Sequence, residues 1–139
     1  MRERGRRVAF DYGDSRIGVA VCDPDGILAT PLPYISARSP ELKAEILSVL
    51  SEYEPIAIYV GKPLHLSGSE GQSVVKVEKF VAFLETLIDT KLIYVDERMS
   101  TKSAQRLLHD AGKDSKASRS LIDSAAAVTI LETGLLHED

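Results

Sequence analysis

Apolar residues in the first part of the chain occur in short runs separated by turn residues, a pattern typical of β-strands. The runs Arg7–Asp11 and Ile17–Cys22 are joined by a short, turn-rich connection, so we expect an antiparallel hairpin. A third strand is predicted over Ile27–Ser36, where Pro31 and Pro33 confine it to a sheet edge or to an irregular extended path. These three runs predict an antiparallel meander.

The apolar spacing then changes to that of amphipathic helices, which alternate with further strands. We expect a helix that begins at Ser39-Pro40-Glu41, with Ser39 as its capping residue, and ends near Glu54. A buried strand over Pro55–Val60 leads into a long loop over Gly61–Gln72. The remaining expected elements are a helix with its inner face from Val77 to Ile88, a strand over Leu92–Val95, a helix that begins at Ser100 and a last helix over Ser118–Leu136.

A meander followed by alternating helices and strands specifies an α/β fold with a five-stranded mixed sheet, antiparallel in its first half and parallel in its second, flanked by helices. The length of 139 residues and the hydrophobic content of 44% suit one core, so we expect a single domain over residues 1–139. No apolar run approaches the roughly 18 to 20 residues that cross a bilayer, and the start lacks a secretory signal. We therefore expect a cytoplasmic protein without a membrane segment.

The net charge of −4 argues against a protein that coats nucleic acid through a broad basic surface. A polyanion would have to meet a local basic patch. The N-terminal arginines, Arg2 to Arg7, are one candidate, and the alternative is that they are solvated charges in a disordered stretch over residues 1–6. The single cysteine, Cys22, allows no internal disulfide and is expected in the core of its strand.

Three acidic residues lie where carboxylates are unusual. Asp11 closes the first apolar strand, and Glu97 follows the last one. If the first strand is central, both acids end strands that point the same way and meet at one edge of the sheet. Asp123 interrupts an otherwise apolar helix, and Ala126 and Ala127 remove bulk from the same face one turn later. Because converging carboxylates repel one another unless a cation joins them, the pattern predicts a divalent-metal site.

Such a site suits the hydrolysis of a phosphodiester, in which two Mg²⁺ or Mn²⁺ ions about 3.5 to 4 Å apart activate a water and absorb the charge of the departing oxygen. Ligands that are all oxygen favour these hard ions over zinc. In this interpretation Asp11 bridges the ions, while Glu97 and Asp123 complete one or both coordination spheres. Each acid also has an ordinary alternative: Asp11 in a turn, Glu97 at an exposed strand exit, and Asp123 paired with Arg119.

Four groups of motifs around these acids follow one another along nearly the whole chain. They are Asp11-Tyr12-Gly13 with Arg16-Ile17-Gly18-Val19-Ala20, Val60-Gly61-Lys62-Pro63-Leu64 with Gly68-Ser69-Glu70-Gly71, Asp96-Glu97-Arg98 with Ser100-Thr101 and Ala104, and Ile122-Asp123 with Ala125-Ala126 and Ile130-Leu131. In these motifs and their order the chain resembles the YqgF/RuvX family of bacterial proteins with an RNase H-like fold. It departs from the family pattern at Asp14, Ser15 and Lys62, which border the expected substrate surface.

The resemblance implies a metal-dependent nuclease whose acidic triad is Asp11, Glu97 and Asp123. Members are linked to maturation of the 5′ end of 16S ribosomal RNA, and the family was also proposed to cut Holliday junctions, so structured RNA and branched DNA are the expected substrates. We interpret the Gly61–Gln72 loop as a mobile flap that faces the substrate. Ser100 has a purely capping role as its alternative. The expected substrate contacts are Gly13, Arg16, Gly61, Lys62, Arg98, Ser100, Thr101 and Arg119.

Two other classes of protein share parts of this pattern. The Asp11-Tyr12-Gly13 motif before a hairpin also resembles the phosphate loop of actin-like ATPases and sugar kinases, but those proteins close two related domains over a nucleotide. A non-catalytic nucleic-acid adaptor with the same fold stays open, although acids at all three positions weigh against it. The assembly state, monomer or homodimer, is open as well; a dimer would suit the two-fold symmetry of a branched junction.

Overall fold

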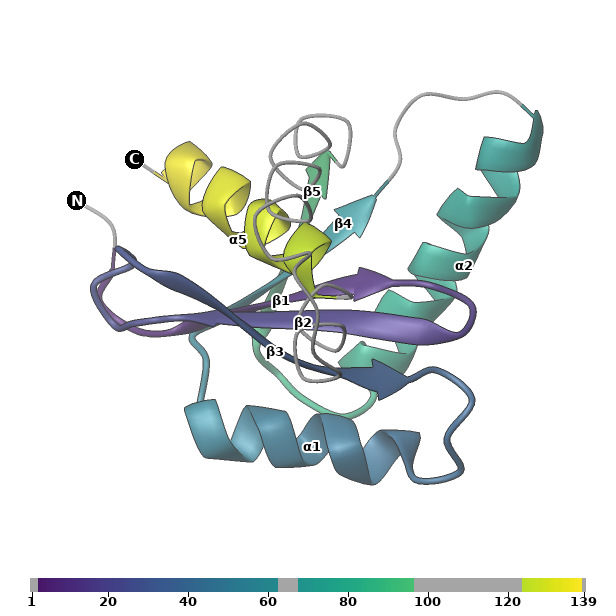
Figure 1. The fold of residues 1–139 in the computed structure, drawn as a ribbon, viewed down its shortest axis with the longest axis horizontal. Helices are drawn as coiled ribbons and strands as arrows, with labels where there is room; N and C mark the ends of the chain where they lie inside the picture. The colour runs from purple at the N-terminus through teal and green to yellow at the C-terminus, as the bar shows by residue number, and fades with distance from the viewer. Residues whose placement is uncertain (1–2, 63–67, 97–123, 139) are drawn as a thin grey trace, which may run out of the picture.

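The structure is a computed structural model that describes residues 3–62, 68–96 and 124–138 (Figure 1). Within these ranges one sheet is formed, with the strand order β3-β2-β1-β4-β5. The strands are β1 (Arg7–Tyr12), β2 (Arg16–Cys22), β3 (Ala29–Ser36), β4 (Ala57–Lys62) and β5 (Lys91–Asp96). The helices are α1 (Leu42–Tyr53), α2 (Gly68–Glu85) and α5 (Ala125–Glu138).

The first strand, β1, lies in the middle of the sheet. It pairs antiparallel with β2 and parallel with β4, and β4 pairs parallel with β5. On the other side β2 pairs antiparallel with β3, an edge strand of the described sheet, where Pro31 and Pro33 cost the ladder least. The predicted five-stranded mixed sheet is therefore confirmed, and so is the central place of the first strand.

Helices cover both faces of the sheet, as Figure 1 shows. One face packs against α1 and α2 through large side chains such as Phe10, Ile58 and Leu84. The other face packs against α5, where the strands contribute smaller residues such as Ala9 and Ala20. Successive residues of a strand point to opposite faces, so the position of each side chain follows from these two cores.

Arg7 joins the start of β1 to the end of α5, and these two ends lie on the same side of the molecule in Figure 1. Its guanidinium donates to both carboxylate oxygens of Glu138, at 3.1 and 2.7 Å, and to the carbonyl oxygens of Gly5 and Glu3, at 2.5 and 2.7 Å. The Arg7 side chain is 1% exposed. Arg7 is therefore a buried structural residue and not one of the solvated charges that the sequence offers as an alternative. The Gly5 N–H also donates to the Pro24 carbonyl at 2.8 Å, within the stretch expected to be disordered.

The first helix begins two residues later than its capping pattern predicts, at Leu42. The Ser39 hydroxyl accepts the Glu41 N–H at 3.0 Å, and the Ser39 carbonyl accepts the Leu42 N–H at 3.2 Å. These bonds close a turn ahead of the helix, so Glu41 takes the N-cap position without a side-chain cap. The predicted cap at Ser39 is wrong for this reason.

The predicted loop over Gly61–Gln72 is wrong at both ends. Strand β4 continues to Lys62, and α2 begins at Gly68. Glycine and serine are poor helix formers, but the apolar face that α2 packs on the sheet outweighs their low propensity. The flap interpretation therefore fails for residues 68–72, and residues 63–67 lie outside the described part. The helix expected from Ser100 and residues 118–123 of the last helix lie outside it as well.

Cys22 lies in the core on the α5 face, as the sequence predicts. It is 2% exposed, and its sulfur accepts the Arg7 N–H at 3.2 Å. Burial raises the pKa of the Cys22 thiol, against the lowering effects of that hydrogen bond and of the Arg7 charge. No helix in the described ranges is long and apolar enough to cross a membrane.

Candidate metal and nucleic-acid site

Asp11 lies near the end of the central strand, on the face that α5 covers. Ala9, two residues earlier, packs in the α5 core, so strand alternation turns Asp11 to that side. Asp11 pairs with Gly18 on β2. On β4, Val60 pairs with Phe10, so the next residue, Gly61, lies at the level of Asp11. Both neighbouring strands therefore carry glycine at the level of Asp11. Glycine inside a strand packs poorly and marks places where a ligand or another backbone comes close.

The parallel strands bring further acids to the same edge of the sheet. Asp96 ends β5 and pairs with Lys62 at the end of β4. Because β1, β4 and β5 are parallel, Asp11 and Asp96 lie at the same edge of the sheet. Their side chains point to opposite faces, since Val95, the residue before Asp96, packs on the α5 face that carries Asp11. Glu97 follows Asp96 in the chain and lies outside the described residues.

Asp123 also lies outside the described residues, and no three acids, histidines or cysteines within the described ranges form a group that could hold a metal. The convergence of the predicted triad therefore stays a prediction. What the described residues contribute is a carboxylate oxygen donor of Asp11, half-buried, at the carboxyl end of the central strand. Such a donor fits a hard divalent ion.

Ser124, at the start of the last helix, lies close to the level of Asp11. Its hydroxyl accepts the Val19 N–H at 3.0 Å and donates to the Leu32 carbonyl at 2.5 Å. Val19 follows Gly18, the β2 partner of Asp11. The sequence does not predict this contact, because a serine among alanines carries no signal of a partner 105 residues away.

The connection between β1 and β2 carries two of the predicted substrate contacts. A Cβ atom on Gly13 would lie 2.8 Å from the Arg16 carbonyl oxygen, so the tight connection itself requires glycine there. Arg16 is exposed, and its guanidinium carbon lies 5.1 Å from the centre of the Tyr34 ring. Arginine stacks on aromatic faces in this way, and a stacked pair offers both a charge and a flat surface. The sequence does not single out Tyr34.

Lys62 lies on the opposite face of the sheet from Asp11. Its amino nitrogen is 3.4 Å from a Glu78 carboxylate oxygen on α2 and 4.3 Å from the centre of the Tyr94 ring. Three of the predicted contacts, Gly13, Arg16 and Gly61, thus lie near the end of β1 that carries Asp11. The fourth described contact, Lys62, lies on the opposite face of the sheet. Arg98, Ser100, Thr101 and Arg119 lie outside the described residues.

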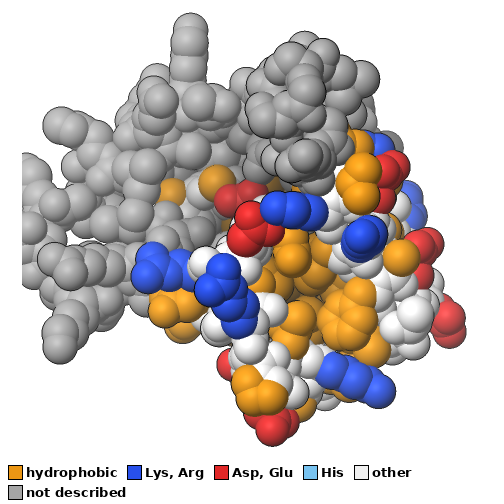
Figure 2. Space-filling view, turned by 90° about the vertical axis from the view of Figure 1, so that its right-hand side faces the viewer, with side chains coloured by type: hydrophobic (Ala, Val, Ile, Leu, Met, Phe, Trp, Pro, Cys, Tyr) orange, Lys and Arg blue, Asp and Glu red, His pale blue; other side chains and the backbone are white. Residues whose placement is uncertain are grey.

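Figure 2 shows the side of the molecule onto which the β1–β2 connection projects. Lys and Arg side chains lie here around an area of hydrophobic side chains, with acidic side chains among them. At the connection itself, the Lys76 amino nitrogen is 3.0 Å from an Asp14 carboxylate oxygen, and both side chains are largely exposed. The protein carries a net charge of −4, so a polyanion would need a local group of basic side chains in order to bind. The Lys and Arg side chains on this side are such a group.

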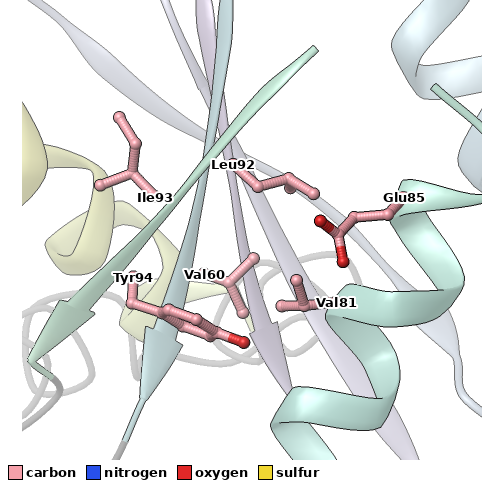
Figure 3. A pocket seen from close by; sticks show the side chains of 6 residues that line it. All are labelled: Val60, Val81, Glu85, Leu92, Ile93 and Tyr94. Carbon is pink, nitrogen blue, oxygen red and sulfur yellow. The ribbon is translucent and has the colours of Figure 1, made fainter. Parts of the chain in front are cut away.

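A cavity of about 230 Å³ lies between α2 and strands β4 and β5 (Figure 3). The Glu85 carboxylate and the Tyr94 hydroxyl are the polar ends of its lining. Val60 and Leu92 place it on the α2 face, so it is separate from the side of the sheet that carries Asp11. The lining residues are Val60, Val81, Glu85, Leu92, Ile93 and Tyr94.

Comparison with known proteins places this arrangement among nucleases. Residues 5–137 match the family described as RuvX, Holliday junction resolvase. Two proteins, from Streptomyces coelicolor and Streptomyces avermitilis, are each 47% identical over 97% of this chain, which corresponds to 82% and 88% of their own lengths. A protein from a Roseiflexus species is 42% identical over 94% of this chain and 93% of its own. All three carry the provisional name pre-16S rRNA nuclease.

Two solved structures share the fold. Thermus thermophilus RuvC in complex with a Holliday junction substrate aligns with a TM-score of 0.55 at 17% identity, covering 96% of this chain and 94% of RuvC. A second Thermus thermophilus RuvC structure aligns with a TM-score of 0.52 at 17% identity, covering 95% and 94%. At this identity the likeness concerns the arrangement of helices and strands.

Proposed function

The chain belongs to the RuvX family, and from that premise we propose that it is a metal-dependent nuclease that processes the 5′ end of precursor 16S ribosomal RNA. Its RNase H-like fold, predicted from the sequence, agrees with the two RuvC structures. The observation that carries the proposal is Asp11: a carboxylate near the end of the central parallel strand, with glycine at its level on both neighbouring strands.

Asp11, Glu97 and Asp123 would hold Mg²⁺ or Mn²⁺, in our proposal as a pair of ions. The oxygen donor of Asp11 fits such ions, and a bound pair supplies an activated water and absorbs the charge of the departing oxygen. Gly18 and Gly61 keep side chains away from the level of Asp11, so a phosphodiester backbone has room to approach. Arg16, stacked on Tyr34, would orient a substrate phosphate beside it.

A Holliday junction is the second candidate substrate, because the matched family is described as a resolvase family. Structured RNA is favoured, since relatives that match nearly the whole chain are named for precursor ribosomal RNA. Gly13, Arg16 and Gly61 are the described residues that we retain as substrate contacts. Two groups of contacts stay predictions: Lys62 on the opposite face, and the four contacts that lie outside the described residues. The single domain over residues 1–139, the cytoplasmic location and the choice between monomer and homodimer stay predictions as well.

The decisive experiment compares cleavage by the wild type and by the Asp11→Asn variant. Precursor ribosomal RNA fragments and four-way DNA junctions are incubated with each protein in Mg²⁺ and in Mn²⁺. We expect wild-type cleavage of the RNA that stops with chelator, and a loss of at least about a hundredfold in Asp11→Asn, since even changes behind the metal ligands reach that size. Thermal unfolding without metal verifies that the variant is folded.

Asp14→Asn is the matched control, because Asp14 is an exposed acid of the neighbouring connection, paired with Lys76. We expect this variant to cleave at nearly the wild-type rate. Wild-type cleavage by Asp11→Asn would refute the assignment of Asp11. Tight RNA binding that survives this substitution, with no cleavage by any variant in Mn²⁺, would instead establish a non-catalytic adaptor.

A further inference from the structure

The ladder between β2 and β3 is irregular at one point. On β2 one residue, Gly18, lies between the paired positions there, whereas on β3 two residues, Pro33 and Tyr34, lie between them. This is a β-bulge, and proline is tolerated in a bulge because it has no N–H to give to the ladder. Bulges change the direction of a side chain and are frequent next to active sites. The bulge therefore gives Tyr34 a position that a regular ladder would not.

Hydrogen bonds on both sides hold the bulge in place. On one side the buried Ser124 hydroxyl accepts the Val19 N–H at 3.0 Å and donates to the Leu32 carbonyl at 2.5 Å. On the other side the Ala37 N–H donates to the Ser15 carbonyl at 2.9 Å, which ties the end of β3 to the β1–β2 connection. Backbone groups beside the bulge thus have partners, so the bulge is a stable part of the fold.

Tyr34 lies at the level of Asp11, with β2 between them. Asp11 pairs with Gly18, and Gly18 lies opposite the bulge. Neighbouring strands are about 4.8 Å apart, so two strand spacings, or about 10 Å, separate the two backbones across the sheet. The residue between them is glycine, so β2 contributes no side chain at this level. A nucleotide whose phosphate lies at Asp11 can therefore bring its own base, or that of the next nucleotide, to Tyr34.

Tyr34 also lies on the same face of the sheet as Asp11. Ile35, the residue after Tyr34, packs in the core under α1 and α2. Ile17, the residue after Arg16, packs in the same core. Because successive residues of a strand point to opposite faces, Arg16 and Tyr34 point to the face that carries Asp11. Their mutual contact, with the guanidinium carbon 5.1 Å from the ring centre, agrees with this placement.

Together Tyr34 and Arg16 offer a flat aromatic surface beside a positive charge. The Tyr34 side chain is 36% exposed, and Arg16 is exposed as well. Bases of nucleic acid stack on aromatic rings, and an arginine charge attracts phosphate. A base can stack on a side chain only when it is not stacked inside a helix, as in single strands, loops and bulges. The pair therefore suits an unpaired nucleotide and not a continuous duplex.

We propose that Tyr34 and Arg16 form a stacking platform for an unpaired base next to the phosphate that lies at Asp11. This role rests on the proposed nuclease function and specifies its substrate class: RNA with unpaired nucleotides at the cut. Tyr34 holds the base, while Arg16 supports the ring and attracts the phosphate of the same nucleotide. Tyr34 determines specificity through binding and does not touch the reacting atoms.

The test compares how the full chain and its Tyr34→Leu variant bind two RNAs, a short single strand and the same strand in a continuous duplex. Chelator prevents cleavage, and fluorescence anisotropy gives the dissociation constants. We expect Tyr34→Leu to bind the single strand about tenfold more weakly, a typical loss when a stacked base loses its aromatic partner, and the duplex nearly as the wild type does. An unchanged constant for the single strand, or an equal loss for both RNAs, overturns the proposal.

Cleavage of the single strand in Mn²⁺ gives a second measurement. Because the platform acts on binding, we expect KM to rise about tenfold in Tyr34→Leu and kcat to stay nearly unchanged. A fall in kcat alone would contradict a stacking role. Tyr34→Phe retains the ring, so its KM should be close to that of the wild type, and a loss as large as that of Tyr34→Leu overturns the proposal.

Tyr94→Leu is the matched control. Tyr94 is 42% exposed, and the Lys62 amino nitrogen lies 4.3 Å from the centre of its ring. It therefore resembles Tyr34 in exposure and in its cation. Val95, the next residue, packs under α5, so Tyr94 points to the face opposite Asp11. We expect Tyr94→Leu to bind both RNAs as the wild type does, and a loss equal to that of Tyr34→Leu overturns the proposal.

Thermal unfolding verifies that each variant is folded. If Tyr34→Leu does not fold, Tyr34→Trp replaces it: the larger ring should bind the single strand at least as tightly as the wild type, and weaker binding overturns the proposal. If the wild type cleaves RNA and Tyr34→Leu binds and cleaves the single strand equally well, the platform fails and the nuclease assignment stands. Weaker single-strand binding by Tyr34→Leu, with no cleavage by the wild type in Mn²⁺, supports the platform and overturns the nuclease assignment.

Discussion

The two faces of the sheet are built in different ways. The face under α1 and α2 is filled by large side chains, with the Phe10 and Phe80 rings in an edge-on contact at 5.8 Å. On the face under α5 the two central strands contribute small residues such as Ala9 and Ala20, and the helix comes so close that a Cβ atom on Gly134 would lie 2.9 Å from the Tyr59 ring. The packing of large side chains stabilises the first face. On the second face, α5 packs close to the sheet and makes polar contacts with it at both helix ends.

This difference matters because Asp11 belongs to the second face. A core of large side chains contributes most of the stability of a domain, because it removes the most apolar surface from water. Hydrogen bonds and ion pairs contribute less but are directional. The molecule therefore has its proposed chemistry on the face where directional contacts decide the geometry.

The largest expected effect is the loss of stability on the first face. Phe10→Ala removes a fully buried ring, and we expect the free energy of unfolding to fall by about 4 kcal/mol, as is usual for phenylalanine in a core. Ala9→Gly, the neighbouring position on the α5 face, should cost only about 1 kcal/mol. Urea denaturation of both variants measures the ratio. Similar losses for the two would mean that the faces contribute equally, against the comparison.

A smaller loss of stability is expected on the second face, from a substitution that adds atoms instead of removing them. Gly134→Ala adds a methyl group that meets ring atoms of Tyr59, so we expect a loss of about 1 to 2 kcal/mol, although alanine is the better helix former by nearly 1 kcal/mol. The measurement is again urea denaturation. In a Tyr59→Leu background the same change should cost less, because the obstructing ring is absent. A gain in stability from Gly134→Ala would show that α5 can move away at little cost.

The sequence predicts the first face better than the second. Alternating and helical apolar spacing identifies residues such as Phe10 and Leu84, and the strand order follows from the chain order with standard connection rules. Hydrophobicity does not identify polar contacts between distant residues. Ser124 and Arg7 both bond across more than a hundred positions, and neither bond has a local pattern.

For the candidate site, the sequence identifies Asp11 and its place at the end of a central strand. The sequence also offers Lys62 as a substrate contact, and the structure places Lys62 on the opposite face of the sheet from Asp11, because neighbouring residues of a strand point to opposite faces. The glycines at the level of Asp11 become meaningful only once the register of three strands is known. Register is a tertiary property, so this part of the site requires the structure.

The smallest expected effect concerns Cys22, a titratable group in the core of the α5 face. Burial holds its pKa above the ordinary value of 9.0, so the folded state retains the thiol proton after the unfolded state has lost it. Above about pH 9 the unfolded chain then binds fewer protons than the folded one, and stability falls as the pH rises through the folded pKa. The free energy of unfolding, measured between pH 8 and about pH 10.5, should fall by at most about 1.4 kcal/mol per pH unit from this group. Cys22→Ala lacks the group, so its stability should approach that of the wild type as the pH rises. Parallel curves for the two proteins would show that the thiol titrates alike in both states, and the α5 face would then be less well sealed from water than its small residues and close packing imply.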